Sequence, residues 1–158
     1  MLERTYDDQV CSIARTLEIL GERWTLLIVR DCLLGLRRFD EFQQSLCVAR
    51  NILADRLKRL VDAEVLDRVE YQQRPQRFEY RLTAKGRELA VPIVALMHWG
   101  DRHLPDPAGA PRLTKHRGCG GTLRARLICG RCGSPVPVGE LQVLPGPGLP
   151  AQQPAVAD

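Results

Sequence analysis

The sequence has few aromatic residues and no long apolar run. Only 5% of its 158 residues are Phe, Trp or Tyr, and no stretch approaches the roughly 18 consecutive apolar residues of a transmembrane helix. The N-terminus carries acidic residues and no apolar stretch, so a secretory signal is not expected either. These absences predict a cytoplasmic protein. Because thiols stay reduced there, the six cysteines are interpreted as core residues, metal ligands or redox sensors rather than as disulfides.

The residue patterns of catalysis are also missing. The sequence has no Ser/His/Asp arrangement, no glycine-rich loop that would cradle a phosphate, and no paired carboxylates with a defined pocket. We therefore expect that the protein is not an enzyme. A thiol oxidoreductase that uses Cys129 and Cys132 would need the strand and helix context of a thioredoxin, which the sequence around these cysteines lacks.

Charge is distributed unevenly along the chain. The formal net charge is only +4, but residues 50–87 hold ten Lys/Arg against six Asp/Glu, whereas the rest of residues 1–104 holds seven against ten. A basic face beside an acidic remainder favours phosphate binding, because each neutralised phosphate releases condensed counterions. The local excess therefore points to double-stranded DNA as a partner.

Apolar residues recur at helical spacing in four segments of the first half of the chain. The spacing predicts helices over residues 10–20, 24–34, 39–46 and 49–63, with glycines ending the first two. The fourth helix is the most informative because its two sides differ in polarity. Its apolar stripe is expected to face the core and consists of Ile52, Leu53, Leu57, Leu60 and Val61.

A β-hairpin is predicted next, from residues 66–73 and 77–83. Alternation would place Val69 and Tyr71 on one face, together with the partner strand's Phe78, Tyr80 and Leu82. Beyond the hairpin, Thr83 is a candidate N-cap for a last helix that reaches Trp99. Pro92 is expected to kink or divide that helix.

Two tightly joined helices followed by a basic hairpin fit the reading of a DNA major groove, which is about 12 Å wide and admits one helix. The start of the fourth helix could reach base edges or phosphates, its later cations could hold the backbone, and the hairpin tip could lie along the neighbouring groove. The alternative is a simple solvated charged face. The predicted DNA-binding residues are Arg50, Asn51, Asp55, Lys58, Arg59, Arg74 and Arg77.

Five segments, in this order and spacing, resemble the signature of the HxlR family of bacterial regulators, which are relatives of the MarR group. They cover most of residues 10–104. The segments are residues 11–30 (CSIARTLEILGERWTLLIVR), 35–42 (GLRRFDEF), 53–60 (LADRLKRL), 80–89 (YRLTAKGREL) and 98–100 (HWG).

The resemblance implies a mainly α-helical winged helix-turn-helix fold and a homodimer whose first and last helices pair across a two-fold axis. Two recognition helices would then meet a pseudo-palindromic operator with half-sites about 34 Å apart. An ordinary intramolecular core is the alternative for the residues of the pairing surface. This surface would use Val10, Ile13, Leu17, Val91, Val94, Ala95 and Trp99.

The function favoured at this point is a sequence-specific transcription regulator, a repressor rather than an activator by analogy with the family. A redox, electrophile or small-molecule signal would change the separation of its recognition helices and so its operator affinity. The rival is a winged-helix protein-interaction module with a zinc ribbon. That module would bind DNA weakly and without preference for its own promoter region.

Three residues depart from the family's pattern. Ala49 stands where the family usually has Ser, so the fourth helix lacks a side-chain cap worth about 1 kcal/mol. Glu64 stands where Gly is common, which requires either a different turn or a left-handed backbone at Glu64. Ser12 replaces a usual Pro at the entry to the first helix.

Cys11 is the candidate redox sensor. It lies near the start of the first helix, where the helix dipole favours a thiolate, and some members of the resembled family sense oxidants through a cysteine at this position. The alternative is that Cys11 is a small buried apolar residue, the common situation of a free cysteine.

Two pairs of metal-binding residues follow the helical part. His116 and Cys119 form one pair, Cys129 and Cys132 form the other, and nine residues separate the pairs. This spacing predicts a zinc-ribbon-like segment with one zinc ion as cofactor. The alternatives are a thiol–disulfide pair of Cys129 and Cys132, or cysteines without metal.

The domain organisation predicted from these patterns has four parts. Residues 1–104 form the DNA-binding and dimerisation domain, and residues 105–115 form a linker. Residues 116–143 form the zinc-ribbon-like segment, and residues 144–158, rich in Pro, Gly and Ala, are expected to be disordered.

Overall fold

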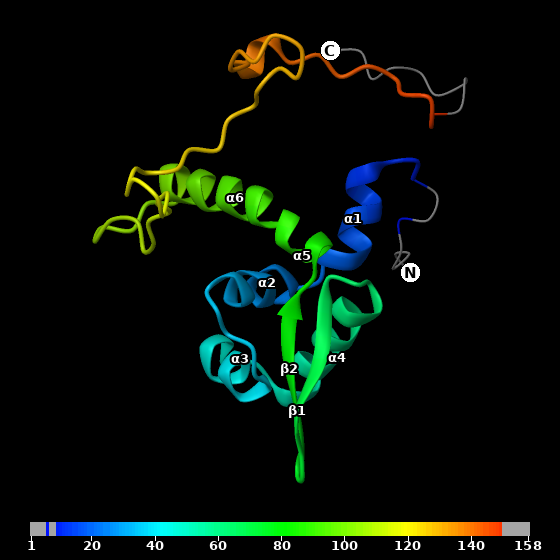
Figure 1. Ribbon diagram of the computed structural model, residues 1–158. Coiled ribbons are helices and arrows are strands. Elements are labelled where there is room, and N and C mark those ends of the chain that lie inside the picture. Colours follow the sequence, from blue (N-terminus) through cyan, green and yellow to red (C-terminus); the bar gives the residue numbers. More distant parts are fainter. Residues whose placement is uncertain (1–5, 7–8, 150–158) are drawn as a thin grey trace.

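The computed structural model describes Tyr6 and residues 9–149 and is mainly helical with one antiparallel hairpin (Figure 1). Its order of elements is that of the predicted winged helix-turn-helix fold. None of the helices in this described part of the chain is long and apolar enough to cross a membrane. The elements are α1 (Ser12–Leu20), α2 (Thr25–Leu33), α3 (Phe39–Leu46), α4 (Arg50–Asp62), β1 (Leu66–Gln73), β2 (Gln76–Leu82), α5 (Ala84–Glu88), α6 (Ala90–His103) and the short 3-10 helix η1 (Val138–Glu140).

The hydrophobic core lies where α2, α3, α4 and the start of the hairpin meet. Leu53, Leu57 and Leu60 recur at helical spacing on α4 and are completely or almost completely buried. Each such leucine stabilises the fold by about 1.5–3 kcal/mol through burial. The predicted apolar stripe of α4 was too wide, since Ile52 is 36% exposed and Val61 only half-buried.

Residues with left-handed backbone follow α2, α3 and α4, and Trp24 with φ 82° precedes α2. Gly35 has φ +100° just after α2, and Cys47 has φ 48° at the end of α3. Glu64 follows α4 with φ 57°, so the chain accepts a side chain at a position that favours glycine. Ala49 is the N-cap residue of α4 and, having no side-chain oxygen, gives the helix no side-chain cap, as predicted.

The hairpin's faces differ from the prediction. The strands pair Leu66 with Leu82 and Glu70 with Phe78, whereas Val69 lies opposite Glu79. Val69 therefore lies on the face opposite that of Phe78 and Leu82, because residues directly across an antiparallel pair share a face. An irregularity in the register between residues 70 and 72 removes Tyr71 from the alternation.

The last helical stretch is divided, as predicted from Pro92. The Thr83 hydroxyl accepts a hydrogen bond from the Gly86 N–H at 3.0 Å and caps α5, as expected. The break between α5 and α6 falls at Leu89. Pro92 is the third residue of α6, and it has no N–H to bond the carbonyl of Glu88, the last residue of α5.

The molecule has two distinct ends. The wing formed by β1 and β2 projects at one end with α3 and α4 beside it, and α1 and α6 lie at the other end (Figure 1). In α6 only Ile93 is buried. Large apolar side chains of α1 and α6 remain exposed, including Ile13 at 70%, Val91 at 72% and Trp99 at 53%.

The chain after α6 forms two small hairpin loops and little else. None of residues 104–149 is buried. His98 of α6 holds the first loop, because its ring nitrogens contact the Thr114 hydroxyl at 3.1 Å and the Ala125 N–H at 3.5 Å. Residues 144–149 contain no helix or strand, and the rest of the predicted disordered tail lies outside the described residues.

Candidate nucleic-acid interface

The start of α4 presents an exposed cation held against an aromatic ring. Arg50 and Asn51 are both exposed, and the Arg50 guanidinium carbon lies 4.9 Å from the centre of the Phe39 ring in α3. Such a cation–π contact contributes about 0.5–1 kcal/mol at an exposed site. It restricts Arg50 to the junction of α3 and α4 while leaving its N–H groups available to an acceptor.

Further along α4, the predicted DNA-binding residues are exposed but form ion pairs within the helix. Lys58 Nζ lies 2.5 Å from an Asp62 carboxylate oxygen, and Arg59 Nε lies 3.2 Å from Asp55. Exposed ion pairs of this kind contribute at most about 1 kcal/mol. Phosphates can therefore displace the carboxylates, and Asp55 acts in this structure as a partner of Arg59.

Arg56 was not singled out from the sequence, yet it fixes the position of α4. Its side chain is 16% exposed and reaches Glu22 at 2.7 Å and the Arg23 carbonyl oxygen at 3.3 Å. Both acceptors lie in the turn between α1 and α2. In the sequence, the only indication of this anchoring role is the position of Arg56 between the apolar stripe and the outer face of α4. Its partner Glu22 lies more than thirty residues away in the chain.

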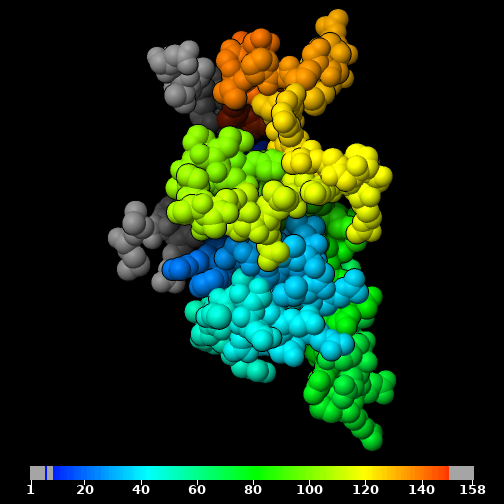
Figure 2. Space-filling model, turned by 90° about the vertical axis from the view of Figure 1, so that its left-hand side faces the viewer, coloured from blue at the N-terminus to red at the C-terminus, as the bar shows by residue number. Residues whose placement is uncertain are grey.

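The wing is fixed to the body through the loop before α3. The Tyr80 N–H donates to the Arg37 carbonyl at 2.7 Å, and Arg38 forms an isolated bridge with Glu79. A hydrogen bond from Arg81 lowers the pKa of the Glu79 carboxyl, and the positive charges of Arg81, Arg38 and Arg37 act in the same direction. Arg74 and Arg77 lie at the free tip, exposed, where the wing projects from the body (Figure 2).

The arginines at the start of α4 and at the wing tip remain available to bind a ligand. Among the described residues, no carboxylate forms an ion pair with Arg50, Arg74 or Arg77. Together with the exposed outer side of α4, they form a cationic surface that is suited to phosphates and base edges.

The segment Thr83–Gly86 connects the end of α4 to the helices beyond the wing. The Thr83 hydroxyl donates to the Glu64 carbonyl at 2.7 Å, and Lys85 Nζ donates to the Ala63 carbonyl at 2.8 Å. These bonds satisfy carbonyl groups that the end of α4 leaves without helical partners. The position of α4 is thereby coupled to α5 and α6.

The cysteines of the helical part differ in their surroundings. Cys11 is the N-cap residue of α1 and is half-buried. Burial, with the charge of Asp31 beside it, raises the pKa of the Cys32 thiol to about 12. Cys32 is therefore protonated at neutral pH and unsuited to oxidant sensing. Cys47 is exposed at the end of α3.

The four predicted metal ligands form two pairs in the structure. His116 Nδ1 lies 3.2 Å from Cys119 Sγ. Hydrogen bonds from Ser134, with a further one from Cys129, lower the pKa of the Cys132 thiol. The two pairs do not converge: among the described residues no three His, Cys, Asp or Glu side chains are close enough to share a metal ion.

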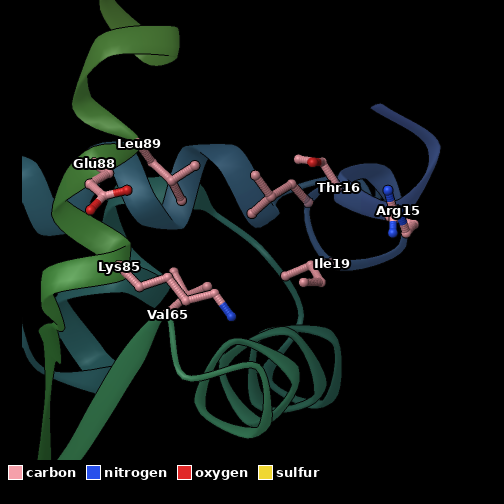
Figure 3. A pocket seen from close by; sticks show the side chains of 8 residues that line it. Arg15, Thr16, Ile19, Val65, Lys85, Glu88 and Leu89 are labelled. Carbon is pink, nitrogen blue, oxygen red and sulfur yellow. The ribbon is translucent and has the colours of Figure 1, made fainter. Parts of the chain in front are cut away.

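A pocket of about 360 Å³ opens between α1, the start of β1 and the junction of α5 with α6 (Figure 3). Its interior is apolar, and charged groups lie at its edge. Figure 3 shows Lys85 and Glu88 on one side and Arg15 on the other. The lining residues are Arg15, Thr16, Ile19, Leu20, Val65, Lys85, Glu88 and Leu89.

Comparison with known proteins identifies the same architecture. The family model described as HxlR-like helix-turn-helix matches residues 19–107. Rv3095, an uncharacterized HTH-type transcriptional regulator of Mycobacterium tuberculosis, is 45% identical over 141 residues, which is 89% of each chain.

Solved structures agree with this match. The crystal structure of PA1607, described as a candidate transcription factor, has a TM-score of 0.75 at 38% identity over 85% of this chain and 94% of that one. The redox regulator HypR in its reduced form has a TM-score of 0.56 at 27% identity, over 60% and 96% of the two chains. The similarity to Rv3095 and PA1607 extends past residue 107 into the C-terminal segment.

Proposed function

The chain belongs to the HxlR-like helix-turn-helix family of transcriptional regulators, and from this premise we propose that it is a homodimeric repressor. Each protomer would place α4 in the major groove of one half-site and its wing along the neighbouring groove. Half-sites would be separated by about one helical turn, roughly 34 Å. A dimer bound across a promoter in this way would exclude the polymerase.

The exposed polar and basic residues of α4 and the wing support the proposed placement of α4 in the major groove. Arg50 and Asn51 lie at the exposed start of α4, and Arg74 and Arg77 lie at the tip of the wing. In the proposal, Arg50 and Asn51 contact base edges or phosphates, whereas the wing arginines contact phosphates. Lys58 and Arg59 hold the DNA backbone after exchanging Asp62 and Asp55 for phosphates.

The opposite end supports the dimer. The exposed apolar side chains of α1 and α6 occupy two helices at the same end of the molecule, and exposed apolar surface of this kind is typical of a protein–protein interface. Pairing with a second copy would cover Ile13, Val91 and Trp99. The single observation that carries the proposal is the placement of exposed arginines at one end of the protomer and exposed apolar helices at the other.

The test is a footprint of the purified protein on DNA that flanks its own gene, together with the mass of the free protein and of the complex in solution. We expect protection of two half-sites by one dimer and a strong preference over a random fragment of equal length. A reporter driven by the same promoter should rise when the gene is deleted. A monomer, or equal affinity for promoter and random DNA, would instead favour the protein-interaction module.

A signal that releases the operator is part of the proposal. Cys11 would sense an oxidant or electrophile, since its helix α1 lies in the proposed dimer surface, and HypR is described as a redox regulator. We expect diamide to release wild-type protein from the operator and to leave Cys11→Ser bound. Release of both proteins at the same diamide concentration would remove Cys11 from this role.

The pocket in Figure 3 provides a second route for such a signal. It lies between α1, which belongs to the proposed dimer surface, and the Thr83–Gly86 segment, which is bonded to the end of α4. A small apolar ligand bound there would favour one separation of α1 and α5 over another. Because α5 is coupled to α4, the spacing of the recognition helices in the dimer would change with it.

A further inference from the structure

The two hairpin loops after α6 repeat the same backbone geometry. In the first, the His116 carbonyl accepts from the Gly120 N–H at 2.8 Å, and the His116 N–H donates to the Gly121 carbonyl at 2.8 Å. In the second, the Cys129 carbonyl accepts from the Gly133 N–H at 2.9 Å, and the Cys129 N–H donates to the Ser134 carbonyl at 2.9 Å. Every partner in the second loop occupies the same place relative to Cys129 as its counterpart does relative to His116.

The repeat extends to the residues around the loops. An isolated bridge joins Lys115 to Thr122 in the first loop and Ile128 to Pro135 in the second. Gly120 and Gly133 both have φ +71°, a left-handed conformation that favours glycine. Each turn therefore places a potential ligand at its first position and another at its fourth.

These four positions carry the side chains that bind zinc. They supply one imidazole and three thiols, and His116 Nδ1 already lies 3.2 Å from Cys119 Sγ. Nitrogen and thiolate ligands in a set of four form tetrahedral structural zinc sites, and spacing of two residues within each pair is usual for them. Asp and Glu side chains, which would favour harder cations, are missing from residues 107–139.

The local charge suits the same ion. Three thiolates and a neutral imidazole around Zn²⁺ carry a net charge of −1. Of the Asp, Glu, Lys and Arg side chains, residues 107–139 contain only basic ones, and their positive charges offset the negative charge of such a site. These residues are Arg112, Lys115, Arg117, Arg124, Arg126 and Arg131.

The segment also lacks a buried core of its own. None of residues 104–149 is buried, and large apolar side chains stay exposed between the loops, among them Leu123 at 42%, Leu127 at 53% and Ile128 at 56%. Segments too small to bury a core are usually held by disulfides or metals. Closing the two loops on each other would cover these side chains.

We propose that the two loops of one chain close around a single zinc ion held by His116, Cys119, Cys129 and Cys132. In the structure the loops lie apart, and residues 123–127 between them form neither helix nor turn (Figure 1). In the zinc-bound protein of this proposal, a turn formed at residues 124–126 brings both loops to the same side. Zinc binding releases the three thiol protons to solvent and is coupled to the formation of this turn.

The first test measures metal content in the full-length protein, purified under reducing conditions. We expect about one zinc ion per chain, the stoichiometry of a structural site with four protein ligands. Replacement by Co²⁺ should give the visible spectrum of a tetrahedral site, with thiolate-to-cobalt charge transfer corresponding to three sulfurs. That band should fall by a third in Cys129→Ser.

Matched controls come from a cysteine and a histidine outside the loops. Cys47→Ser removes another exposed thiol, and His103→Gln removes an exposed imidazole. Both should keep the zinc content and the cobalt spectrum of the wild type, whereas Cys129→Ser with Cys132→Ser should lose them. Only traces of zinc in the wild type, with no tetrahedral cobalt spectrum, would overturn the proposal. Equal losses in Cys47→Ser would overturn it too.

The second test follows the turn itself and does not depend on DNA binding. Arg124 and Arg126 are exposed, so trypsin should cut the chain between the loops rapidly once zinc has been removed with a chelator. Zinc added back should protect both bonds, while cleavage at Arg112 in the linker stays unchanged. Equal cleavage after Arg124 and Arg126 with and without zinc would show that the loops do not close on each other.

Discussion

Gly86 is a residue at which no side chain fits. A Cβ atom there would lie 2.2 Å from the Val65 carbonyl oxygen and 2.9 Å from Leu82 Cδ2, well inside van der Waals contact. The neighbouring bonds from Thr83 and Lys85 to the end of α4 require α5 to approach this closely. The glycine therefore permits the close approach that couples α4 to the helices beyond the wing.

We predict that Gly86→Ala lowers the free energy of unfolding by about 1–3 kcal/mol, the usual cost of overpacking a close contact. Urea denaturation followed by circular dichroism measures it. Gly100→Ala in α6 is the control, because nothing lies within 4 Å of the added methyl group. Gly100→Ala should leave stability unchanged or raise it by up to about 1 kcal/mol, since alanine favours a helix. Equal losses in both variants would contradict this account.

Glu79 should give the attachment of the wing a dependence on pH. Its carboxyl has a lowered pKa in the folded protein, first because Arg81 donates to it. A lowered folded pKa stabilises the fold above the pH at which the unfolded chain takes up its proton. This stabilisation is lost as the pH falls through the folded pKa.

We therefore predict that Glu79→Gln melts at a lower temperature than the wild type at pH 7, and that the difference shrinks as the pH falls below 4. Thermal melts over this range provide the measurement. If the difference between the two proteins stays constant down to acid pH, the carboxylate does not contribute through its charge.

Among the elements, local sequence signals located the helices more accurately than the faces of the hairpin. The predicted helix at residues 39–46 coincides with α3, since Gly35 and the apolar spacing act within a few residues. The predicted face of Val69 was wrong because it depends on the register with the partner strand, in which Leu66 pairs with Leu82 and Val69 with Glu79. The division of the last helical stretch was predictable, because Pro92 cannot donate a hydrogen bond to the Glu88 carbonyl.

The exposed cations of the candidate site could be predicted from the sequence, but the contacts that fix their helix in place could not. Exposure of Arg50, Arg74 and Arg77 followed from their positions on a helix start and a hairpin tip. The anchoring of α4 by Arg56 could not be predicted, because Glu22 belongs to a turn that is distant in sequence. The repeated geometry of the two C-terminal loops emerged only from their hydrogen bonds, although their ligand spacing was visible in the sequence.

The wing should contribute to DNA affinity mainly through charge. We predict that the double variant Arg74→Ala with Arg77→Ala binds the operator more weakly and with a smaller salt dependence. The slope of log K against log salt should become shallower by about 0.9 for each phosphate that the variant no longer neutralises. Because random DNA has the same phosphates, its binding should weaken in parallel. Titrations at several salt concentrations measure both effects.

The control for the wing is Arg102→Ala, which removes the same charge from an exposed position in α6 at the opposite end of the protomer. Its salt slope should equal that of the wild type. A slope unchanged in the wing variant, or lowered as much in Arg102→Ala, would mean that the tip does not bind phosphates.

At the scale of the whole molecule, the proposed function makes the two ends depend on each other. A single protomer presents one α4 and one wing, so under the proposal it would cover one half-site only. Joining two protomers through α1 and α6 would make binding to the second half-site intramolecular, which can raise affinity on the order of 10²-fold or more without any new interaction. In the proposed dimer, the exposed apolar side chains of α1 and α6 would therefore affect DNA affinity, although they lie far from the wing.

We predict that Ile13→Glu, alone or with Val91→Glu, yields a folded monomer, because both side chains are about 70% exposed and support no core within the protomer. Burying a carboxylate opposite its own copy across a two-fold axis would oppose pairing. Operator affinity should fall on the order of 10²-fold, while affinity for an isolated half-site stays unchanged. Val143→Glu, at a side chain 84% exposed beyond the second loop, should remain dimeric and bind like the wild type. Light scattering and titrations on full and half operators separate these outcomes. A variant that stays dimeric with full affinity would place the interface on another surface.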